Sequence, residues 1–347
     1  MTRIGILTGG GDCPGSNAVI RALVRRGEAH GTEVIGFRNG WAGVLEDDAV
    51  KLTHQSTSGI LHRGGTMLGT SRTNPFAAPA AAEEVLARMR ASLEGWGVEA
   101  LVPIGGEDTL GVALRLAQEG IHVVGVPKTI DNDLAGTDFT FGFHTAVQIA
   151  TDAIDRLHTT AESHNRVIVI EVMGRHAGWI AAYSGMAGGA DAILVPERPF
   201  DVEEVAAHLR HRHEAGRTFS IVVTAEGATP RDGAMRASER EGTDAFGHVR
   251  LGGIAVELEC ALEERTGYES RMTILGHTQR GGSPTAYDRV LATRFGVAAM
   301  DAVQRGERDC MVALRATDVI TVGLEESLRE PKLLDPVLYE TAAVFFG

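Results

Sequence analysis

The run Pro127–Asp133, with the sequence PKTIDND, brings a cation, a hydroxyl and two carboxylates together within seven residues. Asp131 can accept a proton from an attacking hydroxyl group, and Asp133 can coordinate a metal ion. Phosphoryl transfer needs little beyond positioning, charge neutralisation and such a base. The chain has only three lysines and Lys128 is one of them, so its place in this run indicates chemistry rather than surface solvation.

A second run, Gly105–Thr109 (GGEDT), joins two glycines to two adjacent carboxylates. At the start of a helix, Glu107 and Asp108 are suited to N-capping. They are also suited to Mg²⁺, which binds a few carboxylates together with water and substrate phosphates. From these residues alone both interpretations stay open.

A third run, Thr8–Gly15 (TGGGDCPG), follows an apolar segment. Backbone without side chains can approach an anion closely, and a helix from Ser16 would point its N–H groups at that anion. A tight turn is the alternative. A dehydrogenase-type dinucleotide loop is disfavoured, because the spacing differs from GxGxxG.

Positive charge recurs at the ends of apolar runs, although the protein is acidic with a formal net charge of −13. One such residue alone is ordinarily a surface residue with a salt-bridge partner. Repeated in this way, these residues favour a single cleft that binds anions. They are Arg72, Arg166, Arg175, Arg271, His277 and Arg280.

Short apolar runs alternate with helical patterns, which is typical of parallel sheets covered on both faces. Two series of runs predict two α/β lobes, and ligands of such sheets bind where the strands end. Strands of the first series are predicted at Arg3–Leu7, Glu33–Phe37, Ala100–Ile104 and His122–Val126. Helices are predicted from Ser16, at Glu83–Trp96 and at Thr109–Glu119. Strands of the second series are predicted at Val167–Val172, Ala192–Val195, Phe219–Thr224 and Met272–Leu275. The polar segment Ala228–Asp244 is expected to be an exposed loop.

Composition excludes several classes of protein. The 347 residues are 44% hydrophobic and 23% charged, an ordinary globular balance. The net charge argues against a nucleic-acid partner or an anionic membrane surface. Three separated cysteines without a CxxC pair predict neither a disulfide framework nor a zinc site, and favour the cytoplasm. No apolar stretch approaches the ~20 residues of a membrane span, and the N-terminus does not resemble a signal peptide.

Eight ordered motifs closely resemble the phosphofructokinase family over nearly the whole chain: TGGGDCPGSN, GGTMLGTSR, GGEDT, PKTIDND, SHNR, VMGRHAGW, AEG and LGHTQRGGSP. The resemblance implies an α/β fold of two Rossmann-like lobes, with mainly parallel sheets flanked by helices. A donor lobe would comprise 1–142 and 279–328, and a sugar-phosphate lobe 143–278 and 329–347. Fructose 6-phosphate would bind in the cleft, in a homo-oligomer that is a dimer or a tetramer.

The resemblance also implies roles for individual residues. Asp131 would deprotonate the sugar 1-hydroxyl, Thr129 would help to position the transferred phosphoryl group, and Glu107 and Asp133 would hold Mg²⁺. The donor would contact Gly11, Arg72, Gly105, Gly106, Asp108 and Lys128, with Arg72 neutralising charge in the transition state. The sugar phosphate would contact Thr129, Ile130, Asp131, Met173, Gly174, Arg175, Glu226, His277, Thr278, Gln279 and Arg280. Arg166 and Arg271 would reach the 6-phosphate in the site of a neighbouring subunit.

Asp108 departs from the pattern of the ATP-dependent members, which usually have a glycine beside the nucleotide α-phosphate. Two unit charges ~4 Å apart repel by about 4 kcal/mol at an effective dielectric of about 20. Pyrophosphate has no third phosphate and avoids this repulsion. Lys128 resembles the pyrophosphate-dependent members, although lysine also occurs here in some ATP-dependent relatives. Pyrophosphate is therefore the expected donor. Asp108 and Lys128 are both expected to be catalytic residues.

A family effector site is matched only in part. Arg21 and Arg25 match two of its arginines, whereas His158 and Arg217 stand where further basic residues are expected. Effector binding and a solvated helix face both stay open as interpretations of this pair of arginines.

The leading hypothesis is Mg²⁺-dependent, reversible phosphoryl transfer from pyrophosphate to fructose 6-phosphate, in glycolysis or gluconeogenesis. An ATP-dependent phosphofructokinase is the nearest alternative. A NAD kinase-like enzyme would explain GGEDT but not the later motifs, and a non-catalytic sugar-phosphate sensor would be expected to lack Asp131. Other phosphosugars, such as sedoheptulose 7-phosphate, stay open as acceptors.

Overall fold

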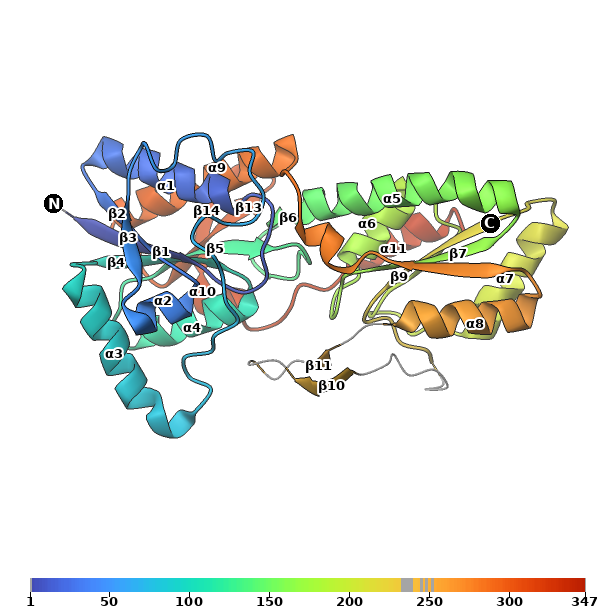
Figure 1. Ribbon diagram of the computed structural model, residues 1–347, viewed down its shortest axis with the longest axis horizontal. Coiled ribbons are helices and arrows are strands. Elements are labelled where there is room, and N and C mark those ends of the chain that lie inside the picture. Colours follow the sequence, from blue (N-terminus) through green and yellow to red (C-terminus); the bar gives the residue numbers. More distant parts are fainter. Residues whose placement is uncertain (1, 232–239, 244–245, 247–248, 251–252, 347) are drawn as a thin grey trace.

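Two sheets form the centres of two lobes in the computed structural model, which describes residues 2–231, 240–243, 246, 249–250 and 253–346 (Figure 1). The larger sheet has eight strands among these residues, in the order β14-β13-β5-β4-β1-β2-β3, with β6 paired to β5. Its edge strands β3 and β14 are antiparallel to their neighbours and its central strands are parallel. The strands are β1 (Arg3–Thr8), β2 (Glu33–Phe37), β3 (Ala49–Leu52), β4 (Ala100–Gly105), β5 (Val124–Thr129), β6 (Phe141–Gly142), β13 (Cys310–Arg315) and β14 (Asp318–Gly323).

The smaller sheet is parallel throughout, with four strands in the described part of the chain, in the order β12-β7-β9-β8. Its central strands are completely buried because helices cover both faces, as their uninterrupted apolar sequences require. The strands are β7 (Val167–Val172), β8 (Ala192–Leu194), β9 (Ser220–Ala225) and β12 (Ser270–Ile274).

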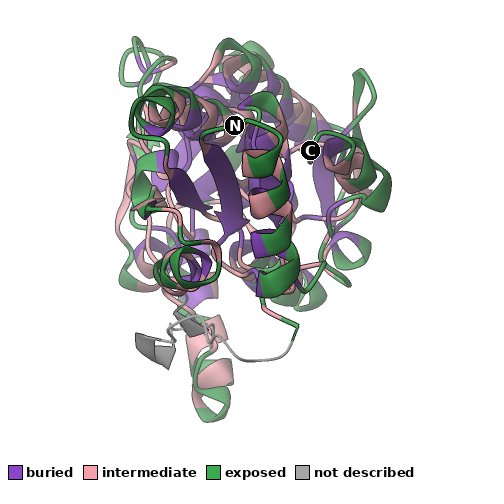
Figure 2. Ribbon diagram, turned by 90° about the vertical axis from the view of Figure 1, so that its right-hand side faces the viewer, coloured by how far each residue is buried: buried purple, intermediate pink, exposed green. Residues whose placement is uncertain are grey.

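Helices cover both faces of each sheet, so that buried strands lie between helices with exposed outer surfaces (Figure 2). On the larger sheet, α1 (Ser16–His30) and α9 (Ala286–Gln304) cover one face. The opposite face carries α2 (Trp41–Glu46), α3 (Ala82–Gly95), α4 (Glu107–Gln118) and α10 (Leu324–Ser327). On the smaller sheet, α5 (Phe143–His164) and α6 (Trp179–Ala187) face α7 (Val202–Glu214) and α8 (Ile254–Thr266) across the strands. The remaining short elements are β10 (Arg240–Thr243), β11 (Val249–Arg250), α11 (Pro336–Ala343) and the 3₁₀ turns Pro79–Ala81 and Gly276–Arg280.

One hydrophobic core runs through both lobes on the side of α1, α9, α5 and α6. It joins Ile6 and Phe295 of the larger lobe to Ile154 and Ile170 of the smaller one. Because close-packed side chains resist deformation, this shared core couples the positions of the two lobes. The strand ends that carry polar residues are thereby held opposite one another.

The described chain crosses between the lobes three times (Figure 1). The first crossing runs from β6 into α5, and the second from the turn Gly276–Arg280 into α9. The third, residues 328–335, runs from α10 to α11, which packs on α6. The exact lobe boundaries given above remain a prediction.

The predicted strands and helices are confirmed with shifts of a few residues, and two of these shifts affect chemistry. The strand predicted at His122–Val126 extends to Thr129, so Lys128 lies within a strand. The helix predicted to begin at Thr109 begins at Glu107. Residues 232–239 and 244 of the predicted loop lie outside the described residues, and Arg240–Thr243 is a short strand rather than a loop. No helix in the described part of the chain has the length and apolar composition of a membrane span.

Candidate active site

A cavity of about 510 Å³ lies where the strands of both sheets end. Its walls come from the segments after β1, β3, β4, β5, β7 and β9 and from the turn Gly276–Arg280, and most of these follow parallel strands, as expected for ligand sites of parallel sheets. Most of the predicted site residues line it: Gly11, Arg72, Gly106, Glu107, Asp108, Lys128, Thr129, Asp131, Asp133, Met173, Arg175, Glu226, His277 and Arg280. Residues from motifs up to about 270 positions apart in the sequence are therefore brought together.

The turn after β1 shows why glycine is needed there. A Cβ atom at Gly11 would overlap the guanidinium group of Arg280. That guanidinium also lies 3.4 Å from the carbonyl oxygen of Asp12, to which it donates. Gly11 therefore allows the Arg280 guanidinium, carried by the turn at the second crossing between the lobes, to lie against the loop after β1.

Helix α4 brings two carboxylates to the cavity without using them as caps. Its N-cap residue is Gly106, which has no side chain, while Glu107 and Asp108 occupy the first turn. The capping interpretation of these carboxylates is therefore wrong. Acidic groups are stabilised in a first turn by the helix dipole, and both side chains line the cavity.

Lys128 projects from the end of β5 with only 4% of its surface exposed. Its Nζ donates to the carbonyl oxygen of Gly11, its single hydrogen bond within the described residues. Burial, with a smaller contribution from Arg280, lowers the pKa of Lys128 to about 8, while Cys13, Asp12 and Asp131 oppose the shift. Two of its three N–H donors remain available to an anion in the cavity.

Asp131 and Asp133 follow on the same loop. Asp131 Oδ1 is buried with no hydrogen-bond partner among the described residues. Burial raises the pKa of Asp133 to about 7, and the charges of Asp131 and Glu107 contribute to the shift. These carboxylates repel one another, and a bound divalent cation would relieve that repulsion.

These carboxylates fit Mg²⁺ as a cofactor. Glu107 and Asp133 come from different strand ends, line one cavity and affect each other electrostatically. In the described part of the chain, no cluster of three or more acidic, histidine or cysteine side chains could hold a metal ion alone. Mg²⁺ commonly takes one or two carboxylates and completes its octahedron with water and phosphate oxygens, which agrees with this arrangement.

The smaller lobe contributes Met173, Arg175, His176 and Glu226 to the opposite wall. Burial raises the pKa of Glu226 to about 7, with a further contribution from Asp131, while Arg175 opposes the shift. Near neutral pH, a carboxyl group with this pKa is partly protonated. It can therefore donate a hydrogen bond to a hydroxyl group of a ligand or accept one from it.

Five predicted site residues lie outside the cavity lining but next to it: Gly105, Ile130, Gly174, Thr278 and Gln279. Gln279 is completely buried, and its Oε1 accepts from the backbone N–H of Met173 at 2.9 Å. It supports the wall of the cavity from behind. The Thr278 hydroxyl donates to the carbonyl oxygen of Leu275.

Arg166 and Arg271 lie away from this cavity, near the N-terminal ends of β7 and β12, whereas the cavity lies beyond the C-terminal end of β7. Both guanidinium groups contact the Glu269 carboxylate, Arg166 at 2.7 Å and Arg271 at 2.5 Å. Their predicted contact with a neighbouring subunit's site stays a prediction.

Three residues line the cavity without having been predicted as site residues: Gly10, Thr109 and His176. Each is adjacent in sequence to a predicted one. A signal was therefore present, because every residue of a short loop at a strand end is a candidate for ligand contact.

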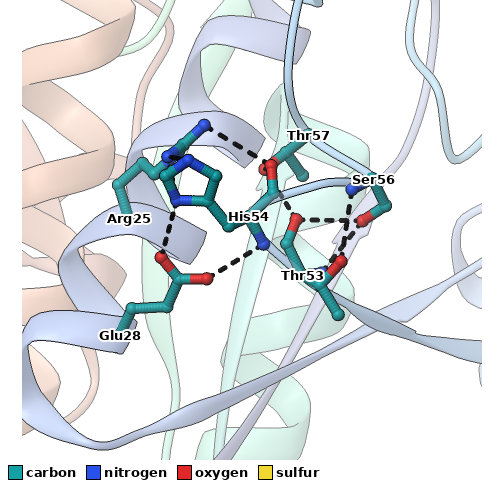
Figure 3. Close-up of polar contacts among 6 residues, drawn as sticks. All are labelled: Arg25, Glu28, Thr53, His54, Ser56 and Thr57. Carbon is teal, nitrogen blue, oxygen red and sulfur yellow. Dashed lines mark hydrogen bonds and ion pairs between the residues drawn. The ribbon is translucent and has the colours of Figure 1, made fainter.

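Arg25, one of the two arginines that match an effector site, is engaged at the surface (Figure 3). Its guanidinium contacts the His54 ring and donates to the His54 carbonyl oxygen at 3.4 Å. Glu28 in turn accepts from the backbone N–H of His54 at 2.9 Å. His158, by contrast, contacts the carbonyl oxygen of Gly188.

Comparisons with known proteins agree with the geometry. A family model described as Phosphofructokinase matches residues 3–303. The chain is 60% identical, over 99% of its length and 100% of the other, to the pyrophosphate–fructose 6-phosphate 1-phosphotransferase of Amycolatopsis methanolica. It is 56% identical, over 98% of both lengths, to ATP-dependent 6-phosphofructokinase 3 of Streptomyces coelicolor. The Pichia pastoris phosphofructokinase structure in the T-state superimposes with a TM-score of 0.84 at 32% identity, covering 99% of this chain and 36% of that longer chain.

Proposed function

The chain belongs to the phosphofructokinase family, and from this premise we propose that it transfers a phosphoryl group from pyrophosphate to fructose 6-phosphate. The products are fructose 1,6-bisphosphate and phosphate. Because pyrophosphate and the product phosphoester are energetically similar donors, the reaction is reversible and serves glycolysis or gluconeogenesis in the cytoplasm.

The position of Asp108 carries the choice of donor. Its side chain lines the same cavity wall as Arg72 and Lys128, the predicted donor-binding cations. A carboxylate there repels the α-phosphate of ATP by about 4 kcal/mol at ~4 Å and an effective dielectric of about 20. Pyrophosphate ends before that position. Relatives of similar identity are named for either donor, so this side chain is the more specific argument.

The residues of the larger lobe then have distinct roles. Asp131 takes the proton of the sugar 1-hydroxyl, and the hydroxyl oxygen attacks one phosphorus of pyrophosphate. The bond between this phosphorus and the bridging oxygen breaks, and phosphate leaves. Thr129 positions the transferred group, while Lys128 and Arg72 neutralise the charge that develops on its oxygens. Glu107 and Asp133 would hold Mg²⁺, which would supply further neutralisation of the phosphate oxygens.

In this proposal the acceptor lies against residues of the smaller lobe and of the turn at the second crossing. Met173, Arg175, Glu226, His277 and Arg280 line the cavity and would surround the sugar phosphate. Arg166 and Arg271 complete the 6-phosphate site of a neighbouring subunit, so the active form is a homo-oligomer, a dimer or a tetramer.

An ATP-dependent phosphofructokinase is the second candidate, favoured by the 56% identity to a relative of that name. The decisive measurement is turnover of fructose 6-phosphate with Mg²⁺ and each donor separately. Higher kcat/KM with pyrophosphate supports the proposal, and equal or higher kcat/KM with ATP contradicts it. A protein that binds fructose 6-phosphate but turns over neither donor would instead be a sugar-phosphate sensor.

Two substitutions at one position test the physical argument. Asp108→Gly is expected to gain ATP use and lose pyrophosphate activity, changing the donor ratio several hundredfold, as about 4 kcal/mol allows. Asp108→Asn is the matched control, because it keeps the size of the side chain and removes its charge. If charge dominates, both variants accept ATP; if size dominates, only Asp108→Gly does. An unchanged donor ratio in both would show that Asp108 does not select the donor.

A further inference from the structure

The third crossing between the lobes, residues 328–335, passes directly behind the loop that carries Asp131 and Asp133. The backbone N–H of Lys332 donates to the carbonyl oxygen of Asp133 at 2.7 Å. The carbonyl oxygen of Lys332 accepts from the indole N–H of Trp179, on the smaller lobe, at 3.0 Å. One residue of the crossing segment is therefore bonded to the candidate catalytic loop on one side and to the second lobe on the other.

All three N–H donors of the Lys332 ammonium group are engaged by acceptors within the protein. Its ammonium group donates to Asn132 Oδ1 at 3.0 Å and to the carbonyl oxygens of Thr137 and Asp138 at 3.0 and 2.8 Å. An ammonium group has three N–H donors, so none remains for a ligand. The Phe139 and Trp179 rings lie 5.9 and 5.1 Å away and favour the cation further.

All three acceptors lie on the segment that follows the candidate base, and Asn132 is the most informative of them. It lies between Asp131 and Asp133, is completely buried, and has a φ of +55°. For a non-glycine residue such a conformation costs of order 1 kcal/mol or more and persists only where the surroundings hold it. Asn132 Oδ1 also accepts from the backbone N–H of Thr140 at 3.1 Å, whereas Nδ2 has no partner within the described residues. The amide is thus held through Oδ1 alone, by Thr140 and Lys332.

Lys332 is not among the residues that line the candidate active-site cavity. It lines a separate cavity of about 390 Å³ together with Trp179, Phe139 and Arg315. Any influence on chemistry must therefore pass through Asn132 and the Asp133 peptide. An ordinary tether between the lobes would have no need to bond to Asn132, which lies between the two carboxylates, and to the peptide of Asp133.

We propose that Lys332 is a positioning residue for phosphoryl transfer, holding Asn132 and the Asp133 peptide so that Asp131 faces the attacking hydroxyl. The inference rests on the proposed phosphoryl transfer at this loop, but not on the identity of the donor. Reacting groups displaced by about 1 Å can lose about 100-fold in rate. Loss of the ammonium group should therefore act on kcat, while binding of the sugar, which depends largely on the other lobe, changes little.

The test compares Lys332→Met, which keeps the length of the side chain and removes its donors, with Lys51→Met. Lys51 is exposed and contacts Glu33 on the far edge of the larger sheet. Lys332→Met is expected to lower kcat about 100-fold, to leave KM for fructose 6-phosphate within about twofold, and to raise the Mg²⁺ concentration needed for half-maximal rate. Lys51→Met is expected to leave all three unchanged.

A double-mutant cycle separates positioning from general loosening. Glycine adopts positive φ freely, so Asn132→Gly removes the amide without backbone strain. If Lys332 acts through Asn132, the loss of kcat in the double variant is no larger than in the more damaged single variant. Fully additive losses, or a wild-type kcat in Lys332→Met, would overturn the inference.

Lys332→Gln covers the case in which the methionine variant does not fold, because glutamine keeps two N–H donors. It is expected to fold with an intermediate kcat, and a wild-type kcat with glutamine overturns the inference. A wild-type protein that is inactive with both pyrophosphate and ATP would overturn the proposed function itself. An active wild type with unaffected Lys332 variants overturns this inference alone.

Discussion

Lys128 is buried and Lys332 is half-buried, and burial lowers the pKa of each to about 8. They differ in what their ammonium groups contact. Lys128 makes one hydrogen bond within the described residues, to Gly11, and lines the candidate active-site cavity. Lys332 makes three, to Asn132, Thr137 and Asp138, and faces a different cavity.

The difference separates two uses of the same side chain. A buried cation with spare donors is costly to the fold and useful to an anionic ligand. A buried cation with every donor satisfied stabilises the segment it binds and offers nothing to a ligand. Burial and pKa alone would not distinguish these two lysines, whereas a count of donors used does.

The largest expected effect is on Lys128. Lys128→Met should lower kcat/KM with pyrophosphate about 1,000-fold, in the range found for a lost group that stabilises transition-state charge. Its stability should not fall, because an apolar group replaces a poorly paired buried charge. Activity and the urea midpoint of unfolding measured on one preparation check both parts. A loss of activity accompanied by a lower midpoint would mean that Lys128, like Lys332, stabilises the fold through its own hydrogen bonds.

Lys332→Met should behave in the opposite way towards unfolding. Acceptors on two buried residues, Asn132 and Thr137, and on the exposed Asp138 lose their donor, so we expect the free energy of unfolding to fall by about 2 kcal/mol. Urea denaturation compared with Lys128→Met measures the contrast directly. If both variants have the same midpoint, the distinction between the two lysines fails.

Alkaline pH provides a test without removing either side chain. With a pKa of about 8, Lys128 loses its charge as the pH rises above that value, so kcat/KM for pyrophosphate should fall about tenfold per pH unit. Between pH 8 and 10.5 the unfolded chain keeps the lysine proton that the folded protein releases, so this group's contribution to stability rises with pH. The loss of activity in this range is therefore not caused by unfolding at Lys128.

Lys128→Arg is the control for the pH dependence, since arginine stays charged and the donor's own ionisation is identical in both proteins. The alkaline decline should move upwards in this variant. Identical profiles for Lys128→Arg and wild type would assign the decline to another group.

The smallest effect is expected at the third lysine. Lys51 is exposed and its contact with Glu33 is a surface ion pair, which contributes little to stability. Lys51→Met should leave kcat unchanged and shift the urea midpoint of unfolding only slightly. A larger shift would show that lysine substitutions in this protein perturb folding in general, and would weaken the conclusions drawn from the buried pair.

Much of the fold and of the site was predictable from the sequence. β2 and β7 have the predicted bounds, and the runs GGEDT and PKTIDND lie at strand ends on one cavity. Strands β3 and β14 were not predicted, because as partly exposed edge strands they lack the uninterrupted apolar run of a central strand. The start of α4 was misplaced by two residues, because its N-cap is a glycine without a capping side chain.

The sequence by itself determined which elements form and which of their ends carry charge, because apolar periodicity, glycine loops and clustered polar residues act over a few positions. Only the tertiary structure decided which distant groups meet. Arg280 covers Gly11, Gln279 supports Met173, and Lys332 binds an amide 200 positions earlier in the chain. The physical reason is that such contacts depend on the whole path of the chain between the lobes, whereas a strand or a helix depends mainly on its own residues.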